Sequence, residues 1–377
     1  MEKHYQFSAP GRTEIGGNHT DHQHGCVLAA AVNLETVADV VLNNTEKICV
    51  RSDGYPEFYV SLNDLHVHPE EVNTTVALVR GVAAAFAQRG AKLKGFNANI
   101  HSTVLPGSGL SSSAAFEILI GTIMNVLFFD EKLSAVEIAK IGQYAENVYF
   151  GKPCGLMDQM ASSVGGLVYI DFMDSSIPNV EKIDVDIANY GYAMCIIDSG
   201  ADHADLTDEY AAITSELKDL CSFFGKDYLR QIPENTFFAQ LPDLRGKVTD
   251  RAILRAIHVY QENKRVVKQV AALKEGNIDH FLRLCKESGH SSWMYMQNVY
   301  PSGAIQHQAV AFTLALCDSL LCRKGAYRVH GGGFAGTVQA FVPFDMLEDF
   351  NESIERSLGK GSCHILRIRP YGGIQVQ

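Results

Sequence analysis

The feature that most constrains this chain is a stretch rich in glycine and serine, PGSGLSSSAAFEILIG, at residues 106–121. Residues 96–105, just before it, alternate apolar and polar side chains as a β-strand does. Residues 115–128 are apolar enough to form a buried helix. Such a loop between a strand and a helix leaves the first helical amides free and lets the backbone approach a phosphate closely. The arrangement predicts a phosphate site, and a capped helix after a tight turn is the alternative.

This loop does not match the two commonest nucleotide-binding patterns. It has no lysine where the GxxxxGK[ST] loop requires one, and it is not a GxGxxG turn followed by an acidic residue about 20 positions later. Phosphoryl transfer depends mainly on positioning and charge compensation. Cations from outside the loop are therefore needed if a triphosphate binds here.

The rest of the chain mixes strand and helix patterns. Residues 27–42 are rich in β-branched residues, and Val79, Val82 and Phe86 form an apolar helical stripe. Helices are also expected at 136–148, 204–224, 252–275, 304–322 and 345–358, and strands at 191–198, 326–330, 336–342 and 363–369. We interpret the Lys and Arg run of the helix at 252–275 as the solvated face of an amphipathic helix.

Length and a break in composition indicate two domains. The chain has 377 residues, against roughly 100 to 200 for one domain. Polar residues and Pro178 interrupt the apolar pattern over residues 171–186. We therefore predict an α+β protein with an N-terminal domain at 1–185, which holds the glycine and serine loop, and a C-terminal domain at 186–377.

Charge and cysteine usage exclude several classes of protein. The net charge of −11 argues against a general electrostatic grip on nucleic acid or on an anionic membrane. Nine scattered cysteines without CxxC spacing indicate neither a disulfide framework nor a thiolate zinc site. The sequence shows no signal-peptide pattern and no apolar run of membrane length. We expect a cytoplasmic protein whose partners are small molecules.

A second polar segment, APGRTEIGGNHTDHQHG at residues 9–25, forms a glycine-punctuated turn before a strand. Its donors and acceptors include Arg12, Asn18, His19, Asp21 and His22. Sugar hydroxyls both donate and accept hydrogen bonds, so such side chains suit a polyol ligand. A metal site that includes His24 is disfavoured because the spacing matches no zinc pattern. A solvated polar loop is the remaining alternative.

Two further segments contain residues that suit phosphate chemistry. HGGGFAGTVQAFV, residues 330–342, has three consecutive glycines between expected strands, which permit close backbone approach, and turn geometry alone also explains them. AENVYFGKPCGLMDQMASSVGG, residues 145–166, offers Glu146 and Asp158. Buried carboxylates are costly unless they are paired or used.

Together, these segments resemble the GHMP kinase superfamily, and most closely the galactokinases, over essentially the whole chain. The family motif PGRVNLIGEHTDYN corresponds to PGRTEIGGNHTDHQ here, and the phosphate motif GLSSSAA is intact at residues 109–115. AENVYFGKPCGLMDQ is similar to AEHxFxGxPCGIMDQ, and HGGGFAGTV to TGGGFGGxx. HADLTDEYAAI, at 203–213, and HVYQENKRVVKQVAAL, at 258–273, are similar to HxLxxSEYxxR and HxxxENxRV.

The resemblance implies a two-domain GHMP kinase fold with the active site in the cleft between the domains. It implies phosphoryl transfer from ATP to the anomeric hydroxyl of a hexose. Asp158 matches the carboxylate that orients or deprotonates that hydroxyl, and Arg12 matches the catalytic arginine. Ser113 and Glu146 would hold Mg²⁺. A monomer is expected, with a dimer as the alternative.

The same resemblance assigns the residues that bind the two substrates. The ATP phosphates would be held by Gly107, Ser108, Gly109, Leu110, Ser111, Ser112 and Ser113, with Gly332 and Gly333 supporting that loop. The sugar would be contacted by Asn18, His19, Asp21, Gly155 and Tyr210.

The chain departs from the family in the sugar motif. Asn18 stands where galactokinases have a glutamate that accepts a hydrogen bond from the C6 hydroxyl, and His22-Gln23 replaces Tyr-Asn. Loss of the carboxylate removes repulsion toward an anionic C6, and plant galacturonate kinases share the DHQ triplet at 21–23. Galactose is the leading substrate and galacturonate the alternative. The intact phosphate and catalytic motifs argue against a sugar sensor without catalysis.

Overall fold

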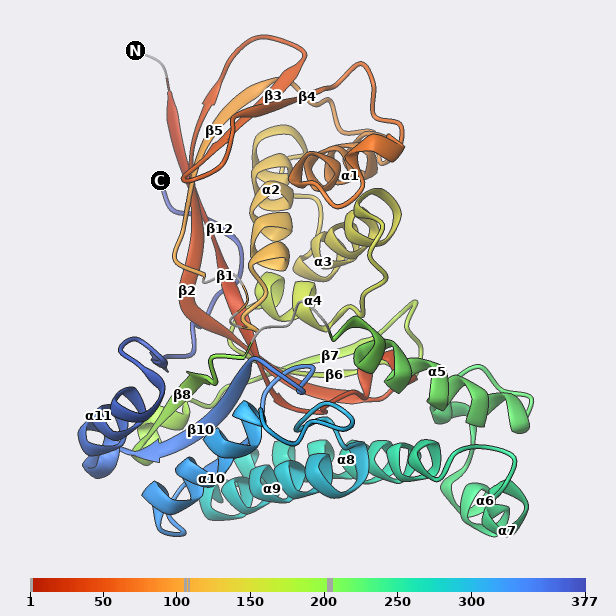
Figure 1. Ribbon diagram of the computed structural model, residues 1–377. Helices are drawn as coiled ribbons and strands as arrows, with labels where there is room; N and C mark the ends of the chain where they lie inside the picture. The colour runs from red at the N-terminus through yellow and green to blue at the C-terminus, as the bar shows by residue number, and fades with distance from the viewer. Residues whose placement is uncertain (1–2, 105–106, 108, 202–205) are drawn as a thin grey trace. The chain divides into compact units, whose positions relative to one another are not determined.

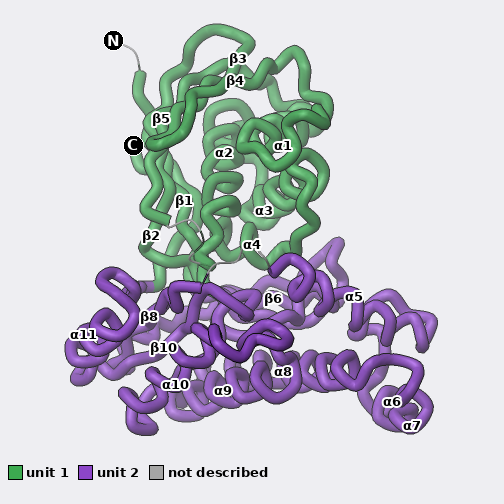
Figure 2. Tube along the Cα trace, in the orientation of Figure 1, with its two compact units in different colours: residues 1–13, 30–166, 368–377 green, residues 14–29, 167–367 purple. Residues whose placement is uncertain are grey.

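The computed structural model describes residues 3–104, 107, 109–201 and 206–377 (Figure 1). The chain forms two compact units (Figure 2), the first of residues 1–13, 30–166 and 368–377 and the second of residues 14–29 and 167–367. These units differ from the continuous ranges 1–185 and 186–377. The reason is that two long strands, β1 (His4–Gly16) and β2 (Cys26–Leu42), each run from one unit into the other.

The first unit contains a mixed sheet in the order β12–β1–β2–β5–β3–β4. Its other strands are β3 (Lys47–Ser52), β4 (Phe58–Ser61), β5 (Phe96–Ser102) and β12 (Ile374–Gln375). β5 runs antiparallel to β2 and parallel to β3. Along β5, Phe96, Ala98 and Ile100 are buried and the residues between them are exposed, because side chains on a strand alternate between its faces.

Four helices lie on one side of this sheet in Figure 1. They are α1 (Thr75–Gln88), α2 (Ser112–Phe128), α3 (Ala135–Tyr144) and α4 (Met157–Val164), and a π-helical segment η3 (Ala145–Phe150) continues α3. Thr74 caps α1, and Ser134 caps α3 in a reciprocal capping box with Glu137. α2 begins without a side-chain cap, and the side chain of Ser111 is used elsewhere.

The second unit contains a four-stranded antiparallel sheet in the order β11–β8–β10–β9. These strands are β8 (Tyr192–Asp198), β9 (Ala326–Val329), β10 (Thr337–Pro343) and β11 (Cys363–Leu366). β6 (Leu167–Asp171) pairs antiparallel with β7 (Asn179–Ile183), and both belong to the eight-stranded sheet of β1 and β2 because β6 also pairs with β2. Short 3₁₀ turns are η1 (Asp21–Gln23), η2 (Pro69–Glu71, in the first unit), η4 (Ile187–Tyr190), η5 (Leu229–Gln231) and η7 (Phe344–Met346).

The helices of the second unit form two apolar clusters. The helices are α5 (Thr207–Phe223), α6 (Glu234–Ala239), α7 (Leu241–Leu244), α8 (Asp250–Lys274), α9 (Ile278–Ser291), α10 (Ala309–Leu321) and α11 (Leu347–Leu358), and a π-helical segment η6 (Ser292–Met296) follows α9. Leu314 of α10 and Phe350 of α11 share one cluster with Ala340 of β10. Leu217 of α5 and Val259 of α8 belong to the other.

Among the described residues, the structure confirms the strand and helix ranges that the sequence predicts, within five residues at the ends. Residue 105 of the range 96–105 and residues 204–205 of the range 204–224 lie outside the described residues. One interpretation is wrong, because residues 9–16 belong to β1 rather than to a turn. The solvated face of α8 is confirmed for Lys264 and Lys268, which are exposed. Arg265 of the same run is 8% exposed, and Arg255 and Glu262 on the opposite side are fully buried.

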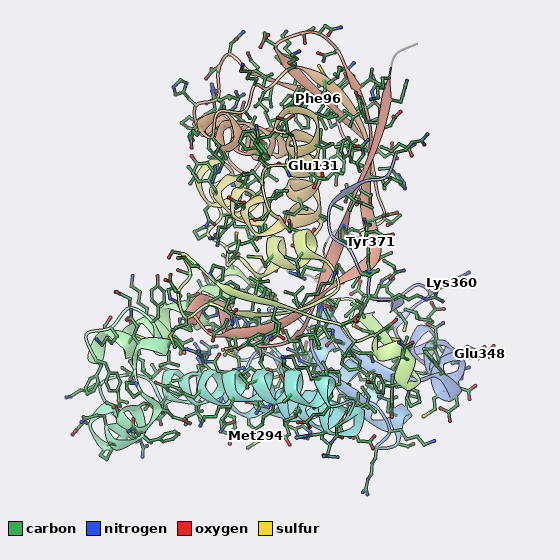
Figure 3. All side chains as sticks on the ribbon, turned by 180° about the vertical axis from the view of Figure 1, so that it is seen from behind. Phe96, Glu131, Met294, Glu348, Lys360 and Tyr371 are labelled. Carbon is green, nitrogen blue, oxygen red and sulfur yellow. The ribbon has the colours of Figure 1, made fainter. Side chains whose placement is uncertain are left out.

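Figure 3 shows the side chains of both units from behind. Phe96 is fully buried, whereas Met294 and Tyr371 are half exposed or more. All nine cysteines are free thiols. No helix in the described parts of the chain has the length and apolar character needed to cross a membrane.

Candidate active site

Arg12 and Asp158 form a bidentate ion pair in the first unit. Arg12 lies on β1, and Asp158 lies in the first turn of α4. The Nε and Nη2 groups of Arg12 donate to Oδ1 and Oδ2 of Asp158 at 2.7 and 2.6 Å. Nη1 of Arg12 donates to the carbonyl of Gly109. One guanidinium therefore connects the predicted catalytic carboxylate to the predicted phosphate loop.

The phosphate loop is shaped by residues with positive φ. Gly107 and Gly109 have φ of 75° and 71°, and Ser111 has φ of 57°. Ser111 occupies the N-cap position of α2, but its hydroxyl donates to Oδ2 of Asp158 at 2.7 Å instead of capping the helix. A left-handed backbone is unfavourable for a serine, so the loop must hold Ser111 in this conformation. In this conformation the Ser111 hydroxyl contacts Asp158 and does not cap the helix.

The remaining loop residues have different environments. The side chain of Leu110 is fully buried, and its carbonyl accepts a hydrogen bond from the Arg12 amide at 3.0 Å. Ser112 and Ser113 open α2 and are partly exposed. Amides of a first helical turn have no acceptor within the helix, so this end of α2 suits an anion. Ser108 lies outside the described residues.

The contacts of Asp158 decide its charge. Burial opposes ionisation, but the charge and hydrogen bonds of Arg12 and the hydroxyl of Ser111 outweigh it and hold the pKa of Asp158 below its ordinary value. The side chain remains 31% exposed, so the carboxylate is accessible. Asp158 is thus an ionised acceptor, and a carboxylate with a lowered pKa is a weak proton acceptor.

A pair of buried glutamates, Glu117 and Glu146, is bonded to Gln159, the residue after Asp158. The Nε2 group of Gln159 donates to Oε2 of Glu146 at 2.7 Å and to Oε2 of Glu117 at 3.0 Å. Within the part of the chain that the structure describes, Oε1 of Glu117 has no hydrogen-bond partner. Lys152 Nζ lies 3.8 Å from Oε1 of Glu146. Burial and the neighbouring Glu146 charge raise the pKa of Glu117 well above its ordinary range.

These carboxylates fit a magnesium ion. Among the described residues, no three His, Cys, Asp or Glu side chains gather into a metal cage. Mg²⁺ is usually held by one or two protein oxygens together with substrate phosphates, so it needs no such cage. Two buried glutamates share a single amide donor, and an unpartnered oxygen remains on Glu117. A divalent cation would offset this excess of negative charge.

In the second unit, Asn18 is fully buried, and both the nitrogen and the oxygen of its side-chain amide form hydrogen bonds. Nδ2 donates to the Gly331 carbonyl at 2.6 Å and to Oε1 of Glu14 at 3.2 Å. Oδ1 accepts from Nδ2 of Asn298 at 2.9 Å. The Asn18 amide therefore holds the glycine turn that begins at Gly331. Asn18 would influence a bound sugar by positioning that turn.

His19 and Asp21 lie at the surface of the same segment, where they are partly exposed. Nε2 of His19 lies 3.0 Å from the Gly332 carbonyl, to which it donates, and Nδ1 lies 3.3 Å from Nε2 of His22. Burial and the adjacent His22 lower the pKa of His19 to about 3, and burial lowers the pKa of His22 as well. Both imidazoles are thus neutral, and a carboxylate of Asp21 stands beside them.

The turn at 331–333 packs against Tyr210, the remaining predicted sugar contact of this unit. The Tyr210 hydroxyl donates to the Gly333 carbonyl at 2.8 Å, and burial raises the pKa of Tyr210 to about 12. A Cβ on Gly332 would lie 2.6 Å from the Tyr210 ring. Gly155 belongs to the first unit, in the loop before α4 that carries Asp158.

Sequence reasoning missed a buried charged network behind this segment. Glu14 pairs with Arg328, and Glu262 pairs with Arg265 and accepts from the Gly17 amide at 3.1 Å. Burial opposes ionisation of Glu262, yet its cationic neighbours lower the pKa of Glu262 to about 2. One signal was present in the sequence: relative to the family motif PGRVNLIGEHTD, Glu14 and Asn18 exchange glutamate and asparagine.

The chain matches two family models and is similar to galactokinases. The model of the GHMP kinases N terminal domain matches residues 77–166, and the galactokinase galactose-binding signature matches residues 2–40. A galactokinase of Actinobacillus pleuropneumoniae is 31% identical over 92% of this chain and 87% of its own length. One from Glaesserella parasuis serovar 5 is 30% identical over 96% of this chain and 92% of its own.

Solved structures show the same fold. Lactococcus lactis galactokinase, crystallised with galactose, superimposes with a TM-score of 0.84 at 23% identity, covering 99% of this chain and 95% of that one. Methanococcus jannaschii mevalonate kinase superimposes with a TM-score of 0.69 at 14% identity, over 97% and 98% of the two chains. The fold is that of a GHMP kinase, and the match to the GHMP kinase N terminal domain includes the glycine and serine loop. Within that superfamily, the chain belongs to the galactokinase family, whose members are ATP-dependent sugar phosphotransferases.

Proposed function

We propose that this chain transfers the γ-phosphoryl group of ATP to the C1 hydroxyl of galactose, giving galactose 1-phosphate and ADP. The observation that carries the proposal is the Arg12–Asp158 pair, bonded through Gly109 and Ser111 to a glycine-rich loop at a helix N-terminus. A match to the galactose-binding signature over residues 2–40 supports the choice of sugar.

Asp158 orients the sugar hydroxyl for in-line attack. Its lowered pKa keeps it an acceptor over the whole physiological pH range, which suits positioning more than strong base catalysis. In a loose transition state the attacking hydroxyl becomes acidic only late, so a positioned weak base suffices. Arg12 holds the carboxylate in place and supplies the positive charge that the loop lacks.

The ATP phosphates lie against the amides and hydroxyls of Gly107, Ser108, Gly109, Ser111, Ser112 and Ser113 in this proposal. Leu110 contributes its backbone only, because its side chain belongs to the core. Ser113 and Glu146 would hold Mg²⁺, which would supply positive charge opposite the bound phosphates. Gln159 orients Glu146 through its 2.7 Å hydrogen bond.

On the sugar side, His19, Asp21, Gly155 and Tyr210 contact the hydroxyls, and Asn18 positions the turn at 331–332. The reaction requires these groups and Asp158 to act on one sugar molecule. Galacturonate would need a cation for its C6 carboxylate. The pKa values of His19, His22 and His24 are all lowered by burial, so these imidazoles are neutral, which favours galactose.

The test is ADP release by the purified protein with Mg-ATP, in parallel with galactose, galacturonate, glucose and N-acetylgalactosamine. We expect galactose to have the highest kcat/KM, by at least about tenfold, or about 1.4 kcal/mol in transition-state preference. A preference for galacturonate would refute the choice of sugar. No turnover with any sugar would refute catalysis and favour a sugar sensor.

A further inference from the structure

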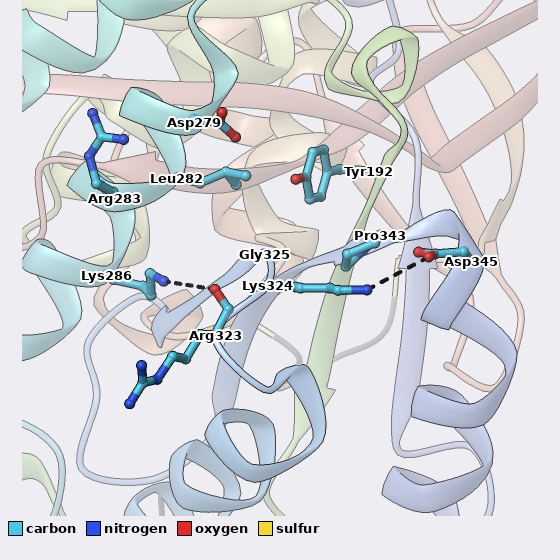
Figure 4. A pocket seen from close by; sticks show the side chains of 10 residues that line it. All are labelled: Tyr192, Asp279, Leu282, Arg283, Lys286, Arg323, Lys324, Gly325, Pro343 and Asp345. Carbon is cyan, nitrogen blue, oxygen red and sulfur yellow. Dashed lines mark hydrogen bonds and ion pairs between the residues drawn. The ribbon is translucent and has the colours of Figure 1, made fainter.

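A pocket of about 510 Å³ lies in the second unit, and its lining contains none of the residues assigned to catalysis or sugar binding (Figure 4). Its walls come from α9, the turn between α10 and β9, and the ends of β8 and β10. The lining residues are Tyr192, Asp279, Leu282, Arg283, Lys286, Arg323, Lys324, Gly325, Pro343 and Asp345. A volume of this size suits a small molecule.

The pocket is cationic in a chain whose net charge is −11. Arg283 and Lys286 come from α9, and Arg323 and Lys324 from the α10–β9 turn (Figure 4). Only two acidic side chains line the same space. The two lysines make long contacts: Lys286 Nζ lies 3.4 Å from the Arg323 carbonyl, and Lys324 Nζ lies 3.9 Å from Asp345. The local charge is therefore positive by two.

The guanidinium groups of the two pocket arginines, Arg283 and Arg323, are available to bind an anion. Within residues 3–104, 107, 109–201 and 206–377, neither Arg283 nor Arg323 has a hydrogen-bond or ion-pair partner for its guanidinium. Both side chains are exposed. Turning a guanidinium toward a bound anion would consequently break no existing interaction.

The backbone that carries Arg323 has an unfavourable conformation. Cys322 and Arg323 have φ of 46° and 72°, and non-glycine residues seldom adopt such values in succession. The turn is held against β10, because a Cβ on Gly325 would lie 2.0 Å from the Phe341 carbonyl. Strain of this kind is retained where the surrounding structure enforces it, and it is concentrated at binding sites.

We propose that this pocket binds a small phosphorylated molecule at a site separate from the catalytic one. A phosphate dianion matches the excess of two positive charges, and guanidinium groups bind phosphate with two parallel hydrogen bonds. Leu282, Pro343 and the ring of Tyr192 offer apolar surface for the rest of the ligand. This site does not depend on the proposed sugar, because none of its residues belongs to the catalytic or sugar-binding set.

The test is calorimetric titration of the full chain with inorganic pyrophosphate. The variant is the double substitution Arg283→Ala and Arg323→Ala. The matched control is Arg356→Ala with Lys360→Ala, which removes the same charge from exposed positions of the same unit (Lys360 in Figure 3). We expect the pocket variant to lose at least tenfold in pyrophosphate affinity for one binding event, and the control to bind like the unmodified chain.

Other outcomes would overturn the proposal. No pyrophosphate binding at millimolar concentration, or equal affinity in the pocket variant, would show that the arginines hold no phosphate. Acetate or glucuronate binding as tightly as pyrophosphate would refute the phosphate class. Parallel titrations with sugar 1-phosphate and with ATP identify the ligand among phosphates. Sugar kinase turnover of the pocket variant is expected to be unchanged. A failed kinase assay would therefore refute the proposed function, whereas a failed titration would refute the phosphate pocket.

Discussion

Two nitrogens of the Arg12 guanidinium, Nε and Nη2, donate hydrogen bonds to the two carboxylate oxygens of Asp158 at 2.7 and 2.6 Å. The third nitrogen, Nη1, donates to the Gly109 carbonyl. Asp158 thereby remains ionised and fixed relative to the loop that approaches the phosphates in our proposal. The side chain of Arg12 is 10% exposed, so its charge is little screened by solvent. This relationship makes Arg12 the residue whose replacement should reveal most about the site.

We predict that Arg12→Lys lowers kcat by at least about 100-fold, because a lysine cannot occupy both carboxylate oxygens and the Gly109 carbonyl at once. Arg12→Ala should additionally raise the pKa of Asp158, since burial would no longer be opposed by the arginine charge. The kcat/KM profile should then decline on acidification at a higher pH than in the unmodified enzyme. A profile that keeps its acid limb would show that Asp158 does not control it.

Asp158→Asn should lose about 10²- to 10⁴-fold in kcat while ATP affinity changes little. The amide still accepts one hydrogen bond but cannot balance Arg12 or draw a proton from the sugar. Steady-state kinetics at saturating galactose, together with direct nucleotide binding, separate the two effects. Ser111→Ala is the matched control: it removes one 2.7 Å hydrogen bond from the same carboxylate and should cost less. Normal turnover by Asp158→Asn would exclude Asp158 from the reaction.

Much of this architecture follows from local sequence patterns. The strand β5, the loop and helix α2 were predicted because alternation, glycine spacing and an apolar run are each local signals. The number of units was predicted, but their discontinuous residue ranges were not. β1 and β2 each contribute residues to both units, and no local pattern shows where a long strand changes its neighbours. The burial of Arg265 on α8 was not predicted, because a run of Lys and Arg does not show that one member would pair with the buried Glu262.

The exchanged pair Glu14 and Asn18 gives a third prediction. Asn18→Glu would place a second carboxylate next to Glu14, whose Oε1 lies 3.2 Å from Nδ2 of Asn18, so we expect a loss of about 3 kcal/mol or more in the free energy of unfolding. The double change Glu14→Asn with Asn18→Glu restores the number of buried charges and should regain much of that loss. Denaturant unfolding of both single variants and the double variant measures this coupling. Additive effects would show that the two positions do not interact.

Glu117→Gln tests the charge state of the buried glutamate pair. Because the pKa of Glu117 is raised in the folded protein, the native state holds a proton that the unfolded state releases, and stability falls as pH rises from the unfolded pKa toward the folded one. The amide resembles the protonated acid and has no such penalty. In metal-free buffer, the variant should therefore gain stability relative to the unmodified chain between pH 5 and pH 8. A constant difference across that range would mean that Glu117 is ionised in the folded state.

The glycine turn at 331–333 permits a graded test of the sugar side. A Cβ on Gly331 would meet nothing within 4 Å, one on Gly332 would lie 2.6 Å from the Tyr210 ring, and one on Gly333 would lie 2.0 Å from the Asn298 carbonyl. Gly331→Ala should thus cost only the strain of its φ of 63°, about 1 kcal/mol. Gly332→Ala should displace Tyr210 and raise KM for the sugar more than KM for ATP. Gly333→Ala, with φ of 79° and backbone as the obstacle, should destabilise the protein most. Thermal unfolding and kinetics on the three alanine variants check this order, and an equal effect at all three positions would contradict the packing against Tyr210 and Asn298.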